Sequence, residues 1–161
     1  MLWRVFRPAL LMVCTTLAAC GGQRAEPETA SGPKVDPGKQ CLEDARASHP
    51  KMPNEPDKIE ASQILVQSTE SRSADSSVAR TPEQACLRAL EALDALNKGS
   101  SFEDAVKKFS DAKGATKGGL GLIGRDDVDP RFADAAFGLD INEFSYVVET
   151  DAGYHIILRT K

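Results

Sequence analysis

Residues 144–159 read FSYVVETDAGYHIILR and predict the most regular element of the fold. The runs 144–149 and 154–159 are rich in β-branched and aromatic residues, a composition typical of strands. Between them, residues 150–153 contain Thr, Asp, Ala and Gly, which favour a tight turn. The stretch therefore predicts two strands joined as a hairpin near the end of the chain.

A strand, a loop and a helix are predicted earlier in the chain. Residues 59–67 are β-branched and apolar at their centre and predict a strand, and the polar residues 68–79 predict a loop. Residues 81–84 read TPEQ and predict a helix start, because the threonine can cap, the proline suits the first helical position and the glutamine completes a capping box. Gly99 ends this helix.

A second helix and an edge strand follow. Ser100 and Glu103 cap the short second helix. Its predicted buried face consists of Phe102, Ala105, Val106 and Phe109. Residues 113–119 predict a mobile loop, and the apolar residues 120–123 predict an edge-like strand with close backbone approach at its glycines.

The third helix and the order of the elements indicate the fold class. Asp129 and Pro130 start this helix, and Gly138 ends it. The elements follow in the order strand, helix, helix, strand, helix, strand, strand. This order indicates an α+β domain, a small mixed β-sheet surrounded by three helices.

The first 20 residues carry the features of an export signal. Arg4 and Arg7 supply positive charge before the apolar run 8–17, which is shorter than the about 20 residues that span a bilayer. Residues 17–20 read LAAC and resemble the bacterial lipobox, in which the peptide is cut before a cysteine that carries acyl chains. Cys20 would then anchor the protein to a membrane. The alternative is an ordinary signal peptide followed by an unrelated cysteine.

The chain after this cysteine predicts a tether. Residues 21–39 contain Gly, Pro, Glu, Ala and Ser with almost no large apolar residue, a composition typical of disorder. We expect a signal peptide at 1–19, a lipidated tether with a short pre-domain segment at 20–57, and a globular domain at 58–161. Because Gly21 is not an aspartate, the anchor would lie in the outer membrane, facing the periplasm, of a cell with two membranes.

Cys41 and Cys86 are the other cysteines of the mature chain. An exported protein meets disulfide-permissive conditions, so the two can pair and link the pre-domain segment to the first domain helix. Alternatively, Cys86 is a small apolar residue on a buried helix face. The sequence leaves both possibilities open.

The composition excludes several kinds of partner. Hydrophobic residues make up 41% and charged residues 27% of the chain, which allows a globular core. The formal net charge of −4 becomes more negative if Arg4 and Arg7 leave with the signal, and it argues against a nucleic-acid partner. With few histidines and no Cys-x-x-Cys pair, the chain predicts no structural zinc site.

From about Ile59 to Lys161 the chain resembles the parvulin family of peptidyl-prolyl cis–trans isomerases. The matching pieces are Ala61-Ser62-Gln63-Ile64-Leu65-Val66, Gly99 with Phe102, Phe109-Ser110-Asp111, Gly118-Gly119-Leu120-Gly121, Pro130 with Phe132, Ala136-Phe137-Gly138-Leu139, Glu143 with Ser145, and Thr150 to Thr160. Each piece is short, but their order and spacing are those of the family. The last piece is especially close to the eukaryotic branch that acts on phosphorylated Ser/Thr-Pro.

The resemblance implies an isomerase that acts on Xaa-Pro bonds of exported proteins and aids their folding. Rotation about this amide breaks no bond, so neither a cofactor nor a metal is needed. A dry pocket for the pyrrolidine ring and polar groups that favour the twisted amide are needed instead. By the resemblance, Leu120, Val128 and Phe132 form the pocket, with His155 beneath it and Thr150 nearby. The alternative is that these are ordinary core residues.

Two candidate catalytic positions depart from the family pattern. Most parvulins have a histidine at the position of Gln63, whose amide can still hydrogen-bond to His155 but does not titrate. The family's cysteine or aspartate falls on Ala112, and the neighbouring Asp111 can take over its role.

A strict phosphate requirement is not expected. Gln67 stands where the phosphate-binding branch has a lysine, and Arg72 and Arg80 alone do not make an arginine cluster. Arg72 remains a candidate contact for any exposed Xaa-Pro segment.

Two functions fit these residues. One is an active isomerase, which the completeness of the domain favours. The other is a degenerate parvulin that binds extended or proline-containing segments without turnover, as a chaperone or assembly module, which Gln63 and Ala112 favour. A purely structural lipoprotein would explain none of the motif order.

Overall fold

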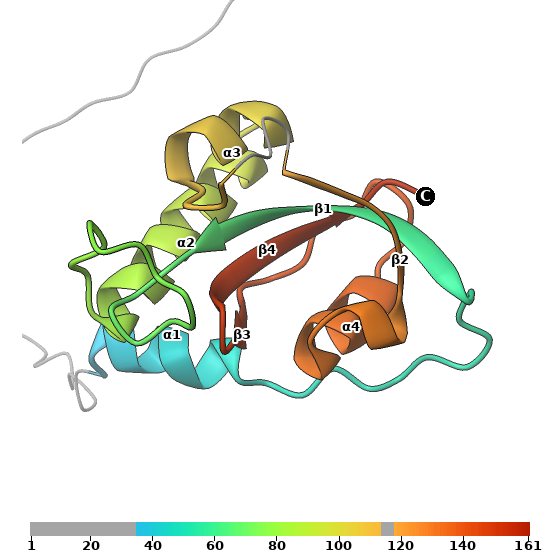
Figure 1. Cartoon of the computed structure of the whole chain (residues 1–161), viewed down its shortest axis with the longest axis horizontal. Helices are drawn as coiled ribbons and strands as arrows, with labels where there is room; N and C mark the ends of the chain where they lie inside the picture. Colours follow the sequence, from blue (N-terminus) through green and yellow to red (C-terminus); the bar gives the residue numbers. More distant parts are fainter. Residues whose placement is uncertain (1–34, 114–117) are drawn as a thin grey trace, which may run out of the picture. The chain divides into compact units, whose positions relative to one another are not determined.

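The computed structural model describes residues 35–113 and 118–161, which form a four-stranded sheet with helices on its faces (Figure 1). The strand order is β2-β1-β4-β3. The strands are β1 (Lys58–Val66), β2 (Gly119–Gly124), β3 (Val148–Thr150) and β4 (Gly153–Arg159). The predicted α+β class is confirmed.

The expected mixed sheet is wrong, because every pair of neighbouring strands is antiparallel. Both neighbours of β1 run from their starting points back toward its N-terminal end. Ser62 faces Gly119 at the start of β2, and Val66 faces Tyr154 at the start of β4. Each neighbour therefore runs back along β1 in the opposite direction.

The three predicted helices are present, and a fourth precedes β1. The helices are α1 (Pro37–Ala45), α2 (Pro82–Asn97), α3 (Phe102–Phe109) and α4 (Pro130–Phe137), with a short 3₁₀ turn η1 (Arg125–Asp127) before α4. The capping box predicted for α2 is formed by Thr81 and Gln84.

The start of α3 differs from the prediction by one residue. Ser101, and not Ser100, caps this helix, and its Oγ accepts a hydrogen bond from the backbone N of Asp104 at 3.1 Å. Ser100 instead closes the preceding helix, since its backbone N donates to the Ala95 carbonyl at 3.0 Å. Gly99 makes this closure possible with a φ of 94°, which favours glycine.

The beginning of α1 lies inside the segment predicted to be a disordered tether. The composition predicts disorder up to about Lys39, yet the helix begins at Pro37. Asp36 caps it, with Oδ1 accepting from the backbone N of Gly38 at 2.8 Å. An aspartate directly before a proline is the same helix-start signal that opens α4. A low average hydrophobicity concealed this local signal.

Packing stabilises this extra helix. Cys41 and Ala45 are buried in the same apolar cluster as α2, and a disulfide joins Cys41 to Cys86 with a Cα–Cα distance of 6.0 Å. The two buried side chains and one cross-link make α1 part of the globular unit.

The two faces of the sheet carry separate apolar clusters, because successive side chains of a strand point to opposite faces. The face that α4 covers carries Ile59, Ala61 and Ile157. The face that α2 and α3 cover carries Ile64, Val66 and Ile156. Gln63 and His155 follow the same alternation and lie on the α4 face.

The first strand of the hairpin is shorter than predicted. β3 begins at Val148, and before it Phe144 makes only an isolated bridge to Leu158. The Oγ of Ser145 accepts from the backbone N of Ile157 at 3.0 Å, so this side chain replaces a regular ladder contact.

Several expectations concern residues outside the described ranges. These are the signal peptide, the lipobox with Cys20, the tether as far as residue 34, and residues 114–117 of the predicted mobile loop. Within the described ranges, no helix combines the length and the apolar character needed to cross a bilayer.

Candidate active site

His155 lies in the middle of the sheet, held between two polar side chains. Its Nε2 is 2.7 Å from Thr150 Oγ1, and its Nδ1 is 2.8 Å from Gln63 Oε1. The Gln63 oxygen can only accept, so Nδ1 carries the proton. Thr150 Oγ1 accepts from the backbone N of Ala152 at 3.1 Å, which leaves its own proton for Nε2. The contacts thus fix both the ring orientation and the tautomer.

The His155 imidazole is neutral at physiological pH. Only 4% of the residue is exposed. Burial disfavours the charged form and lowers the pKa of His155 to about 4. The ring is hydrogen-bonded to an amide and a hydroxyl, and no acidic side chain of the described ranges is hydrogen-bonded to it to offset this cost.

Phe132 connects this histidine to the predicted proline pocket. Its ring meets the His155 ring edge-to-face, with centroids 5.3 Å apart and an interplanar angle of 86°. Phe132 is buried, and Leu120 and Val128 pack as half-buried side chains against the same apolar cluster. The three predicted pocket residues therefore share one apolar cluster, and of the three only Phe132 is shown in contact with His155. A cavity of pyrrolidine size between them stays a prediction.

The arrangement combines an apolar surface with an uncharged ring and few free polar groups. Gln63 Nε2 has no hydrogen-bond partner among the residues that the structure describes, so it remains available to a bound molecule. Across the described ranges there is also no group of three or more His, Cys, Asp or Glu side chains placed to bind a metal. Such a site can bind an apolar ring and orient the neighbouring amide through hydrogen bonds.

Asp111 lies in a different set of contacts from the other predicted catalytic residues. Its carboxylate pairs with Arg80 and accepts from the backbone N of Gln67 at 2.8 Å. Its own backbone N donates to the Leu65 carbonyl at 2.7 Å. These contacts join the segment after α3 to the end of β1. Asp111 therefore stabilises the sheet, and within the described residues it makes no hydrogen bond to His155.

Arg72 belongs to the loop after β1 and contacts the turn between β3 and β4. Its guanidinium pairs with the Asp151 carboxylate, and its backbone N donates to the Asp151 carbonyl at 2.6 Å. The loop after β1 is therefore closed onto the hairpin turn that carries Thr150. The two arginines that the sequence analysis considered for a phosphate contact, Arg72 and Arg80, pair with carboxylates of the protein itself.

Two supporting contacts were not predicted from the sequence. Arg46, just after α1, makes a bidentate ion pair with Glu149, with Nε–Oε2 at 2.6 Å and Nη2–Oε1 at 3.2 Å. The Gly118 carbonyl accepts from the backbone N of Gln63 at 2.7 Å, and the φ of Gly118, 69°, favours glycine. A side chain at this position would collide with the Gln63 carbonyl oxygen. Only the glycine run around residue 118 hinted at this close approach.

Comparison with known proteins agrees with this geometry. The chain matches the family described as "PPIC-type PPIASE domain" over residues 46–160. Peptidyl-prolyl cis-trans isomerase pin1 of Schizosaccharomyces pombe is 44% identical over 108 residues, which are 63% of this chain and 62% of that protein. Foldase protein PrsA of Halalkalibacterium halodurans is 36% identical over 104 residues, 63% of this chain and 26% of that protein.

The fold is shared with a solved structure. Peptidyl-prolyl isomerase ESS1 from Candida albicans superposes with a TM-score of 0.61 at 26% identity, over 68% of this chain and 66% of that one. The matched segment thus spans less than two thirds of the length of pin1 and of ESS1, and about a quarter of PrsA.

Proposed function

The chain belongs to the PPIC-type peptidyl-prolyl isomerase family, and we propose that it catalyses cis–trans isomerisation of Xaa-Pro bonds. The observation that carries the proposal is the contact between His155 and Phe132, which belongs to the apolar cluster that Leu120 and Val128 also join. The uncatalysed rotation has a barrier of ~18–20 kcal/mol, so a site that binds the twisted amide more tightly than the planar one accelerates it.

The proposed mechanism relies on binding and polarity. The planar amide owes its large dipole to C–N resonance, which is lost when the bond twists. An apolar surface at Leu120, Val128 and Phe132 therefore disfavours the planar form more than the twisted one. The free Nε2 of Gln63 can donate to the amide as it rotates, and the neutral His155 holds Gln63 in position.

We propose that the substrates are exposed Xaa-Pro segments of exported proteins, without a strict phosphate requirement. Foldase protein PrsA is one of the relatives, which supports a role in protein folding. The pairing of Arg72 with Asp151 and of Arg80 with Asp111 argues against a dedicated phosphate site.

We also propose that Cys20 carries acyl chains and anchors the protein to a membrane, with the segment before α1 as a short tether. Substitution Cys20→Ser should abolish labelling of the protein by a radioactive fatty acid and move it from the membrane to the soluble fraction. Unchanged labelling of the variant would contradict the anchor and leave the isomerase proposal untouched.

A protease-coupled assay on a short Ala-Pro peptide tests the isomerase function directly. The full chain should accelerate the slow cis-to-trans phase in proportion to its concentration. A phase that keeps the uncatalysed rate at every enzyme concentration would contradict the proposal.

The second candidate function is a peptide-binding chaperone without turnover. Two observations favour it: Ala112 has no polar group in its side chain, and the carboxylate of Asp111 forms an ion pair with Arg80. NMR exchange spectroscopy on a proline peptide separates the two functions, because only an isomerase produces cross-peaks between cis and trans forms.

A further inference from the structure

Four of the exposed large apolar side chains lie around one part of the surface. Within the described ranges, the exposed fraction is 49% for Met52, 38% for Leu90, 59% for Ile141 and 78% for Tyr146. These side chains line three hollows, of about 540, 310 and 220 Å³, and Tyr146 is in the wall of each. We call these three hollows together the Tyr146 surface.

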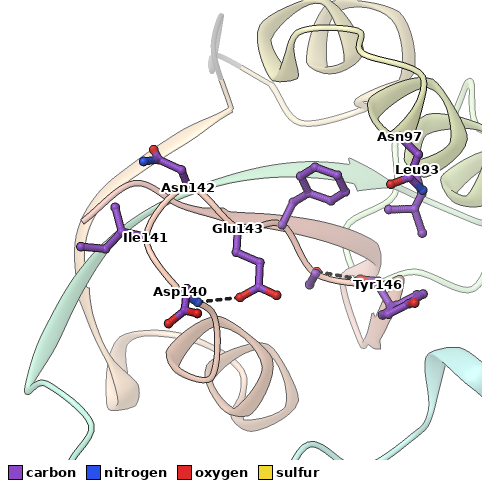
Figure 2. A pocket seen from close by; sticks show the side chains of 9 residues that line it. Leu93, Asn97, Asp140, Ile141, Asn142, Glu143 and Tyr146 are labelled. Carbon is purple, nitrogen blue, oxygen red and sulfur yellow. Dashed lines mark hydrogen bonds between the residues drawn. The ribbon is translucent and has the colours of Figure 1, made fainter.

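The Tyr146 surface is built by the segment between α4 and β3 together with parts of α1, α2 and α4 and the residues that follow α1. Figure 2 shows Asp140, Ile141 and Asn142 on this segment, with Leu93 and Asn97 of α2 across the hollow. The residues that line the proposed proline pocket are in none of its walls. It is therefore a second surface, separate from the proposed active site.

The backbone of the segment is held in place by its own polar groups. Glu143 Oε2 accepts from the backbone N of Asp140 at 2.7 Å, and Ser145 Oγ donates to the Tyr146 carbonyl at 2.6 Å (Figure 2). The same Oγ accepts from the backbone N of Ile157 in β4. A surface that is already ordered loses little conformational entropy when it binds a partner.

The charged side chains that line this surface are acidic, although the Arg159 guanidinium donates to the carbonyl of Leu139, which lines one of the hollows. Its acidic members are Asp44, Asp134, Asp140 and Glu143. Of these, Asp134 is paired with Arg125, and the other three have no ion-pair partner in the part of the chain that the structure describes. No lysine or arginine of that part lines any of the three hollows. Cationic groups are therefore attracted, and anionic groups are repelled.

We propose that the Tyr146 surface binds extended segments of client polypeptides that present lysine or arginine together with apolar side chains on the same face, at every second residue, with no need for proline. Apolar side chains would occupy the hollows beside Tyr146 and Ile141, and cationic ones would meet Asp140 and Asp44. The segment runs from α4, which carries Phe132, into β3, which ends at Thr150. This inference rests on the proposed function and deepens it, since a client held here lies on the segment that joins both sides of the active site.

The direct test is binding of a labelled, proline-free dodecapeptide in which serine occupies every second position and the positions between are filled alternately by lysine and by leucine or valine, so that cationic and apolar side chains share one face. Fluorescence anisotropy with the full chain should give saturable binding, at least tenfold tighter than for the same peptide with glutamate in place of lysine. Amide shifts on binding should be concentrated at residues 140–147. Equal affinity for both peptides would overturn the proposal.

Two variants place the binding on this surface. Tyr146→Ser and Asp140→Asn change exposed side chains, so both should keep the wild-type circular dichroism spectrum and melting temperature. Each substitution should weaken binding of the lysine peptide about three- to tenfold. The matched control is Asp126→Asn, which removes an exposed carboxylate at a different hollow and should leave the affinity unchanged. Equal affinity in all three variants would overturn the assignment.

Failure of the two proposals can be told apart. Both variants should isomerise a short Ala-Pro peptide at the wild-type rate, because a short substrate does not reach the Tyr146 surface. If the chain binds the lysine peptide but does not isomerise the Ala-Pro peptide, this inference stands and the isomerase proposal is wrong. A dimer in sedimentation that Tyr146→Ser dissociates would overturn this inference, since a second copy would then occupy the surface.

Discussion

The Nδ1 of His155 lies 2.8 Å from the Oε1 of Gln63, so an amide occupies the place where most parvulins have a second imidazole. An amide oxygen accepts a hydrogen bond at any pH between about 4 and 10, whereas an imidazole changes its charge near pH 6.5. The contact therefore holds His155 in one tautomer over the whole physiological range.

Removal of this acceptor should weaken catalysis. Gln63→Leu leaves the buried Nδ1–H of His155 without a partner, and an unsatisfied buried donor costs about 1–3 kcal/mol. We expect kcat/KM to fall about ten- to hundredfold, which corresponds to roughly 1.4–2.8 kcal/mol. The control is Gln40→Leu, at an exposed glutamine of α1. Full activity of the Gln63 variant would show that this hydrogen bond is dispensable.

The Phe132 ring should matter for activity beyond its contribution to the core. Phe132→Leu removes the edge contact with His155, and we expect kcat/KM on a Xaa-Pro peptide to fall at least tenfold. Phe137→Leu is the matched control, because Phe137 is buried in the same helix and packs under Arg125 instead. Both variants should lose about 1 kcal/mol of stability by chemical denaturation. A parallel loss of activity in both would mean that Phe132 only supports the core.

The free energy of unfolding should depend on pH through His155. Its pKa is about 4 in the folded state and about 6.5 in the unfolded state, so between these values only the unfolded chain takes up the proton. This contribution is fully present above pH 6.5 and is lost as the pH falls to 4. The change is of the order of 3 kcal/mol.

Urea titrations at several pH values check this dependence against the variant His155→Gln. The carboxylates titrate in both proteins, so the difference between the two curves isolates the histidine. We expect the difference to grow from pH 4 to pH 6.5 and then to stay constant. A difference that is the same at every pH would show that the histidine is not buried in its neutral form.

The pH profile of catalysis should be flat over the same range. Because His155 does not gain a proton above about pH 5, kcat/KM should vary less than twofold between pH 5.5 and 8. Gln63→His adds a second imidazole beside the first and should introduce an inflection near pH 6. An inflection of that kind in the wild type would contradict the neutral state of His155.

Reduction of the disulfide should destabilise the protein. The bond between Cys41 and Cys86 closes a loop with a sequence separation of 45 residues, for which the chain-entropy relation gives about 4 kcal/mol. The double variant Cys41→Ala, Cys86→Ala should therefore melt at a lower temperature than the wild type. Mass spectrometry of unreduced peptides checks the bond itself. Equal melting temperatures with and without reductant would contradict a stabilising role.

Much of the fold was determined by local sequence signals. The capping box of Thr81 and Gln84, the Asp129-Pro130 helix start and the hairpin turn before Tyr154 each depend on residues close together in the chain. Short-range hydrogen bonds and steric preferences depend little on distant parts of the chain, so these elements could be predicted. The resemblance to parvulins then supplied the candidate site residues.

Only the tertiary structure decided the contacts between distant segments. Gln63 and His155 are 92 positions apart, and Arg46 and Glu149 are 103 apart. Whether Asp111 meets His155 or Arg80 depends on where the end of β1 packs, and no local pattern encodes that. The sequence alone therefore determined most of the elements, but not α1, which lies in the predicted tether, nor the late start of β3. The packing of the sheet and helices decided which side chains share a buried, water-poor space, because burial and pairing exist only once distant parts of the chain are in contact.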